Sequence, residues 1–180
     1  MDASRKQRRR PGGPVIALLA VIASMAGAST LPALQLKVPF YPDRTDQCGP
    51  ATLAGVLTFW GKPIEPKQLR EEMYLAKLHG TLPMDLVLTA KNHGLKTEMV
   101  RGDLDILRSE LSAGRPVLAM LNTGFSAVPV DHYVIVTGLD DRRGGVIMHS
   151  AGKQNQYMSN KKFLKQWEKT DYWTLLMRLP

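Results

Sequence analysis

The order of the helix and strand patterns along the chain constrains its fold more than any other feature. Apolar residues recur at helical spacing, mostly in the first two thirds of the chain, and predict helices at 50–61, 66–80, 83–92, 103–113 and 160–169. Short apolar runs bounded by turn residues predict strands at 96–100, 116–121, 132–137, 145–149 and 172–179. Helices followed by a mostly antiparallel sheet are typical of the α+β class.

The segment that begins at Pro50 is expected to be the central, buried helix. Proline is favoured at the first position of a helix, and the residues after it are mostly apolar. Residues 38–42 contain two prolines and are therefore expected to be extended, and 43–49 form a polar turn. The basic segment 160–169 is expected to expose its lysines and to turn Phe163 and Trp167 towards the core.

The first 28 residues have the pattern of a secretory signal peptide. Five basic residues precede the uncharged apolar run from Val15 to Ala28, which ends in small residues. A signal anchor is the alternative, although the apolar run is short for a membrane span of about 20 residues. The expected organisation is therefore a signal at 1–28, a linker at 29–37 and one domain at 38–180. The protein is expected to be exported, to the bacterial periplasm or to the periplasmic face of the inner membrane.

The charge balance changes once this segment is set aside. The whole chain has 24 basic and 16 acidic residues and a net charge of +8, whereas residues 29–180 have 19 and 15 and a net charge of +4. A basic domain that binds nucleic acid normally carries a concentrated positive patch, so no nucleic-acid partner is expected. Membrane contact is expected only through an uncleaved signal.

The chain has one cysteine, Cys48, which excludes a disulfide framework and cysteine-rich metal motifs. Cys48 stands directly before the predicted central helix, where backbone amides and the helix dipole stabilise a thiolate. A buried, unreactive thiol is the alternative, because free cysteines are often core residues. His132 begins a predicted strand 84 residues later and is a candidate to accept the thiol proton and to protonate a leaving amine. The alternative is that His132 is a structural residue at the end of the strand with no catalytic role.

Several motifs together resemble a known family. The extended segment 38–42, the sequence Gln47 to Ala54, the pair Trp60–Gly61 and the strand His132 to Gly138 occur in the order found in the bacteriocin-leader (double-glycine) peptidases of the papain clan, and most closely in their stand-alone exported members. The resemblance implies a papain-like fold in which a helix with the cysteine packs on a sheet that carries the histidine. It also implies that Cys48 is the nucleophile, that His132 is the general base and acid, and that the substrate is a peptide or protein.

Two positions depart from the family pattern. The family usually has a glutamine five or six residues before the cysteine as an oxyanion-hole donor, where this chain has Pro42 and Asp43; Gln47 is the substitute candidate. The family's histidine-orienting aspartate is expected near position 149, where this chain has His149 followed by Ser150. Either side chain can accept a hydrogen bond from the ring of His132, and His149 is the tentative choice. Asp131 is expected to point to the opposite face of the strand.

The resulting hypothesis is an exported thiol peptidase that acts through Cys48 and His132. A catalytically weakened or inactive peptide-binding relative of the same fold is the first alternative, and an acyl transferase that uses a Cys48 thioester is the second. No cofactor is expected, because the chain lacks a complete phosphate-binding loop, and no metal site is expected, because its four histidines contain no pair spaced by four residues.

Overall fold

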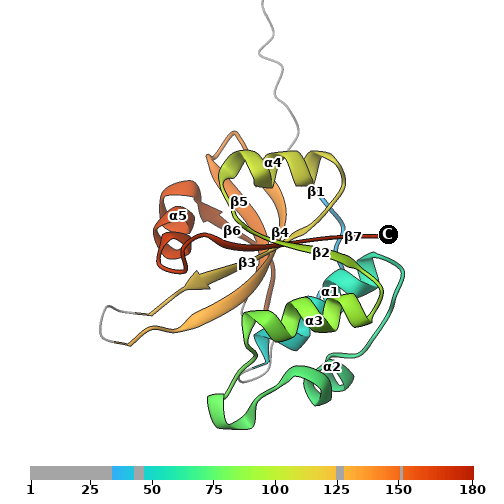
Figure 1. Cartoon of the computed structure of the whole chain (residues 1–180). Coiled ribbons are helices and arrows are strands. Elements are labelled where there is room, and N and C mark those ends of the chain that lie inside the picture. The colour runs from blue at the N-terminus through green and yellow to red at the C-terminus, as the bar shows by residue number, and fades with distance from the viewer. Residues whose placement is uncertain (1–33, 43–46, 125–127, 151) are drawn as a thin grey trace, which may run out of the picture.

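The computed structural model describes residues 34–42, 47–124, 128–150 and 152–180. The predicted signal segment, residues 29–33 of the predicted linker and the turn residues 43–46 lie outside the described residues. The described chain folds into a single mixed sheet-and-helix unit (Figure 1).

The sheet is antiparallel at every described pairing and has the strand order β2-β7-β3-β4-β5-β6, with β1 paired to the second half of β4. Its strands are β1 (Leu34–Gln35), β2 (Lys96–Arg101), β3 (Val117–Asn122), β4 (Asp131–Asp140), β5 (Gly145–Ser150), β6 (Lys153–Ser159) and β7 (Trp173–Arg178). The helices are α1 (Cys48–Phe59), α2 (Pro66–Met73), the 3-10 helix η1 (Ala76–Leu78), α3 (Pro83–Asn92), α4 (Leu104–Ser112) and α5 (Asn160–Glu168). The predicted α+β class is confirmed.

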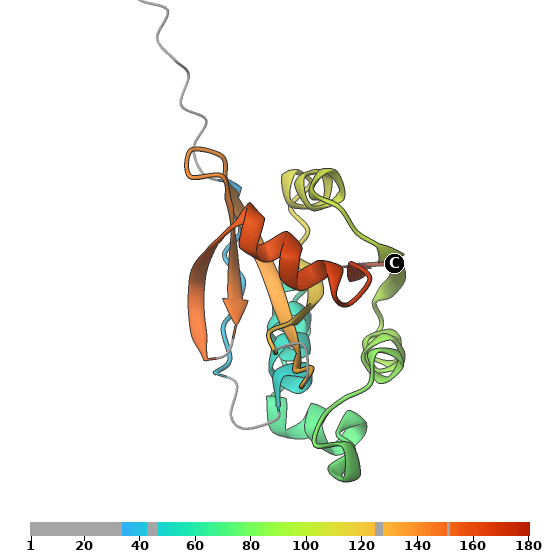
Figure 2. The same ribbon diagram turned by 90° about the vertical axis from the view of Figure 1, so that its left-hand side faces the viewer.

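Each face of the sheet has its own apolar core, because successive side chains of a strand point to opposite faces. Along β3, Leu118 packs with residues of α1, α2 and α3, whereas Val117 and Ala119 pack with residues of α4 and α5. Figure 1 shows α1, α2 and α3 together on one side, and Figure 2 shows the β5–β6 hairpin on the opposite side of the molecule from α3.

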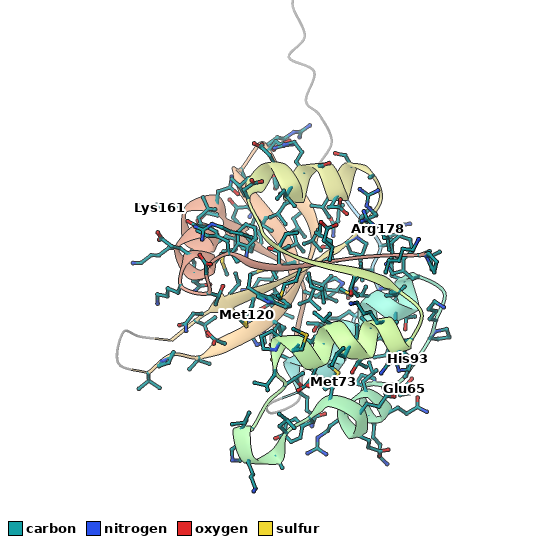
Figure 3. The ribbon with its side chains drawn as sticks, in the orientation of Figure 1. Glu65, Met73, His93, Met120, Lys161 and Arg178 are labelled. Carbon is teal, nitrogen blue, oxygen red and sulfur yellow. The ribbon has the colours of Figure 1, made fainter. Side chains whose placement is uncertain are left out.

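The central helix forms as predicted but begins at Cys48, two residues before Pro50. Every residue from Gly49 to Leu57 is buried, as expected for a helix that is apolar on nearly all sides. In α5 the prediction is also confirmed: Phe163 and Trp167 are fully buried and the lysines are exposed, with Lys161 at the periphery in Figure 3.

Three elements differ from the sequence-based expectation. The helix expected over 66–80 ends at Met73, because Tyr74 is extended and the chain then forms a tight turn closed by a bridge between Leu75 and Gly80. Strand β6 was not predicted, since it is polar and mostly exposed at the sheet edge. The end of the predicted linker is strand β1, which pairs with Gly138 and Leu139 of β4.

Candidate active site

Cys48 lies at the N-terminal end of α1 and not in the helix interior. Cys48 is the first residue of the helix and is half-buried. The Thr52 hydroxyl donates hydrogen bonds to the carbonyls of Cys48 (2.7 Å) and Gly49 (3.0 Å), which fixes the first turn. The amides of a first turn point out of the helix end, and the positive end of the helix dipole lies there. This position favours an anionic sulfur or an anionic intermediate beside it.

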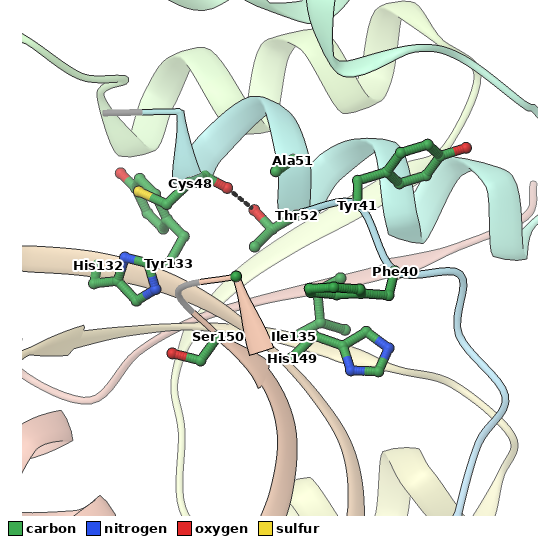
Figure 4. A pocket seen from close by; sticks show the side chains of 11 residues that line it. Phe40, Tyr41, Cys48, Ala51, Thr52, His132, Tyr133, Ile135, His149 and Ser150 are labelled. Carbon is green, nitrogen blue, oxygen red and sulfur yellow. Dashed lines mark hydrogen bonds between the residues drawn. The ribbon is translucent and has the colours of Figure 1, made fainter. Parts of the chain in front are cut away.

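His132 lies at the start of β4, opposite Leu121 of β3. The structure brings it to the same place as Cys48: both residues line one pocket together with Phe40, Ile135 and Ser150 (Figure 4). Burial lowers the pKa of His132 below its ordinary value of 6.5. The neutral imidazole, which can accept a proton, is therefore the favoured form at neutral pH.

The pocket opens into a larger cleft of about 850 Å³, which Cys48, His132, Tyr133 and Ser150 also line. One wall comes from the connection between α2 and α3, where Leu78 and Leu82 leave 59% and 45% of their surface exposed. The opposite walls come from β3 and β4 and from the β6–α5 region. Their lining residues include Met120, Val130, Asp131, Gln156, Met158, Lys162 and Gln166. The site is thus a narrow pocket at the end of a wide, partly apolar groove.

Tyr133 connects the two halves of this site, and the sequence did not single it out. Its hydroxyl donates a hydrogen bond to the Thr81 carbonyl (3.1 Å), and its ring meets Trp173 edge-on at 5.6 Å. Burial, together with the negative charges of Cys48 and acidic neighbours, raises the pKa of Tyr133. Tyr133 therefore stays a neutral donor and ties β4 to the α2–α3 connection. The position of Tyr133 next to His132 in the sequence could have pointed to a role in the site. Its hydrogen-bond partner Thr81 lies 52 residues away in the sequence, so this contact was not predictable.

His149 does not take the orienting position expected for it. Its side chain is 3% exposed and points away from His132, towards Phe40, whose ring it meets at 5.4 Å (Figure 4). Its Nε2 donates to the Val38 carbonyl (2.9 Å), and its Nδ1 accepts from the Asn155 amide (3.2 Å). Both ring nitrogens are therefore engaged behind the site, and neither is left for His132. Burial lowers the pKa of His149, which fits the neutral ring that this pair of contacts requires.

The other sequence candidates have separate positions. Asp131 is exposed and accepts a hydrogen bond from the Asn122 side chain (2.8 Å), its cross-strand neighbour. Gln47 directly precedes α1, is half-buried, and accepts the Ala51 amide at its backbone carbonyl (3.0 Å). The family's usual glutamine falls at Pro42 or Asp43; Pro42 is exposed, and Asp43 lies outside the described residues.

The described part of the chain contains neither a candidate group of metal ligands nor a helix able to span a membrane. Its histidine, cysteine and acidic side chains form no group of three suited to a metal ion. Within the same ranges, none of the helices has the length and apolar character needed to span a membrane.

A cysteine at the start of a buried helix, beside a histidine at the start of an antiparallel strand, places the fold and site in the class of papain-like cysteine peptidase domains. Residues 40–176 match the Peptidase C39 family, and the chain belongs to that family. The predicted resemblance to this peptidase family is therefore confirmed, and the stand-alone exported type stays a prediction. A comparison with curated proteins gave no match.

Several solved structures share the fold of this chain. A putative C39-like peptidase from Bacillus anthracis is 17% identical, with a TM-score of 0.69, over 83% of this chain and 98% of its own. The peptidase domain of Streptococcus ComA, a bifunctional ABC transporter of a quorum-sensing pathway, is 22% identical, with a TM-score of 0.65, over 77% and 96%. A double-glycine-motif protease from an AMS/PCAT transporter, solved with a leader peptide, is 19% identical, with a TM-score of 0.66, over 81% and 94%.

Proposed function

We propose that the protein is an exported cysteine peptidase that cleaves peptide bonds with the Cys48 thiolate as nucleophile and His132 as general base and acid. The observation that carries the proposal is the meeting of these two residues, 84 positions apart in the sequence, in one pocket at the end of an open groove. Membership of a peptidase family supports cysteine peptidase chemistry in general.

In the proposed mechanism His132 accepts the thiol proton and the Cys48 sulfur attacks the carbonyl carbon of the scissile peptide bond. The resulting oxyanion collapses, the C–N bond breaks, and the His132 imidazolium gives its proton to the departing amine. A water molecule, deprotonated by His132, then attacks the thioester and releases the acid product with the thiol regenerated. The lowered pKa of His132 suits the first step, because the ring is neutral at neutral pH.

The oxyanion site is proposed to use the Cys48 amide at the helix end and the side chain of Gln47. Cys48 is the first residue of α1, where the backbone amides of the first turn point out of the helix end, and Gln47 directly precedes it. Removing one oxyanion donor typically lowers the rate by about 10²–10³-fold. Activity with Gln47 in place of the family's usual glutamine is therefore proposed to be weakened rather than lost.

The proposed substrate is a segment of a peptide or protein that lies in the groove. A structural neighbour has been solved with a leader peptide, which supports binding of a peptide by this fold. The wall that exposes Leu78 and Leu82 favours apolar side chains of the substrate.

The central test uses the exported protein and digestion of a peptide library. Cys48→Ser should reduce cleavage to background, because a serine hydroxyl in this setting is a far weaker nucleophile than a thiolate. A second variant, Ser112→Ala, changes an exposed residue at the end of α4 and should cleave like the wild type. Undiminished cleavage by Cys48→Ser would overturn the proposal.

Asp43 favours a second candidate, a peptide-binding relative with weak or no catalysis, because an ionised aspartate donates no hydrogen bond. Asp43→Gln places a donor at one of the two positions expected for the family's glutamine and distinguishes the two candidates. A working but weakened peptidase should become faster, whereas a binding protein should remain inactive and still bind peptides. If the thioester is passed to an added amine instead of to water, the product mass identifies an acyl transferase.

Export is proposed from the pattern of residues 1–28. The intact mass of the protein recovered from the periplasm tests it. Cleavage after Ala28 leaves a chain that begins at Ser29, whereas an uncleaved, membrane-bound chain identifies a signal anchor. A full-length chain in the cytoplasm would contradict export.

A further inference from the structure

Ser150 lines the same pocket as His132 and Cys48 and is a candidate for the group that orients the His132 ring. A Cys–His pair works efficiently only when a third group holds the imidazole with the correct nitrogen towards the nucleophile. The family's aspartate is absent from this chain, so another side chain must fill that role if the proposed function, on which this inference rests, is correct.

Two other side chains that could orient His132 are hydrogen-bonded to different groups. Asp131 adjoins His132 in sequence, but its carboxylate is exposed and bonded to Asn122 across the β3–β4 ladder. His149 has its Nε2 on the Val38 carbonyl and its Nδ1 on the Asn155 amide. Reaching His132 would require His149 to give up both of these contacts and to leave a buried site.

Strand geometry places the side chain of Ser150 on the opposite face of the sheet from that of His149. His149 pairs with Ile135 in the β4–β5 ladder, so these two side chains share a face of the sheet. His132 lies three residues before Ile135, and Ser150 lies one residue after His149, so both belong to the opposite face. Figure 4 shows this arrangement directly: the Ser150 hydroxyl points to the side where the His132 ring lies, and His149 points away. Ser150 also lines both the narrow pocket and the larger cleft with Cys48 and His132.

We propose that the Ser150 hydroxyl is the positioning group for His132. It accepts a hydrogen bond from one ring N–H and so leaves the other ring nitrogen facing Cys48. A hydroxyl holds the ring in this tautomer but brings no negative charge, so it stabilises the imidazolium less than a carboxylate does. The site is thus a Cys–His–Ser arrangement in which orientation is retained and the electrostatic support of the aspartate is given up.

The test measures the rate at which iodoacetamide alkylates Cys48, the sole cysteine of the chain, between pH 5 and 10. This readout needs no substrate. Ser150→Ala should slow alkylation at pH 6–7 by about three- to tenfold, the effect of losing one hydrogen bond. The rates should converge near pH 10, where a thiol with an ordinary pKa of about 8.5 is ionised without help from a base. Ser150→Asp should speed alkylation at pH 6–7, because a carboxylate raises the pKa of His132 and favours the thiolate–imidazolium pair.

His132→Ala and Ser112→Ala are the reference variants, and thermal unfolding of each variant confirms that it folds. Slowing by both His132→Ala and Ser150→Ala, with Ser112→Ala unchanged, supports the inference. Slowing by His132→Ala alone overturns the role of Ser150 while the Cys–His pair stands. An unchanged rate in His132→Ala overturns the pair itself, and the role of Ser150 with it. With a cleaved peptide in hand, Ser150→Ala should lower kcat and leave KM unchanged.

Discussion

At the scale of single residues, the two histidines of the pocket have different roles. The half-buried His132 lines the pocket with Cys48, the proposed nucleophile, whereas the buried His149 ties the Val38 segment to the start of β6. Burial lowers the pKa of both rings below 6.5. The unfolded chain therefore takes up protons at a higher pH than the folded chain does. The stability that depends on these histidines is present above pH 6.5 and is lost as the pH falls from 6.5 through the lowered pKa values.

We expect the wild type to unfold at a lower temperature at pH 5.5 than at pH 7.5, and His149→Gln to reduce this difference. Glutamine offers a donor for Val38 and an acceptor for Asn155 but does not titrate. His132 remains, so part of the pH dependence should persist. Melting curves at the two pH values measure the difference in unfolding temperature. His79→Gln, at an exposed histidine, is the control. An equal pH dependence in wild type and His149→Gln would show that His149 does not contribute.

Gly49, the residue after the proposed nucleophile Cys48, is a second residue-scale constraint. A Cβ at this position would lie 2.8 Å from both Cβ and Oγ1 of Thr81, so alanine would push the α2–α3 connection away from the pocket. We expect Gly49→Ala to lower kcat/KM by about 10–100-fold, the usual cost of misplacing a catalytic group by about 1 Å. The double variant Gly49→Ala/Thr81→Gly should recover part of the loss. If the single variant cleaves like the wild type, the wall near Thr81 does not set the geometry of the site.

At the scale of elements, the docking of α1 on the sheet determines where Cys48 lies. Gly55 allows this close approach, since a Cβ there would lie 2.8 Å from Ile135 Cδ1 and from the Pro39 carbonyl oxygen. Alanine is favoured over glycine inside a helix by about 1 kcal/mol. The steric conflict with β4 and with the backbone of the extended segment acts in the opposite direction, and the backbone cannot move as a flexible side chain can.

We therefore expect Gly55→Ala to lower the free energy of unfolding by about 1–3 kcal/mol despite the helix preference for alanine. Urea unfolding measures this value. Adding Ile135→Val removes Cδ1 and should restore part of the loss, but not the part due to Pro39. A more stable Gly55→Ala variant would mean that α1 packs less closely on the sheet than the structure describes.

At the scale of the whole molecule, the site lies where the helical half meets the sheet. The groove has one wall from the α2–α3 connection and the others from the strands and α5, so the proposed peptide substrate would contact both halves. Residues far from Cys48 can then contribute to substrate binding without touching the reacting atoms. In that case their loss should change KM more than kcat.

Leu78→Glu tests whether the groove wall affects KM more than kcat, because Leu78 is largely exposed in that wall. We expect KM for a long peptide to rise by about three- to tenfold with kcat nearly unchanged, as for the loss of part of an apolar contact. A short peptide that fills only the narrow pocket should be insensitive. Leu88→Glu, on α3 with 49% exposure and outside the groove lining, is the matched control. Equal effects of the two variants would argue against a substrate-binding wall.

The features that the sequence predicted are those carried by local patterns. The spacing of apolar residues predicted most helices and strands, and the residues around Cys48 and His132 predicted the family. The polar edge strand β6 and the early end of α2 were missed. An exposed edge strand has no apolar alternation, and the turn after Met73 is fixed by contacts with the rest of the fold.

By itself, the sequence determined the α+β class, the family, and the placement of one thiol at a helix start and one imidazole at a strand start. Only the tertiary structure decided which side chains surround that imidazole. His149 and Ser150 are neighbours in sequence and His149 was the sequence-based choice, yet strand alternation turns His149 towards Val38 and Ser150 towards the side of His132. The physical reason is that local sequence sets backbone conformation, whereas register and packing between distant segments set the direction and partners of each side chain.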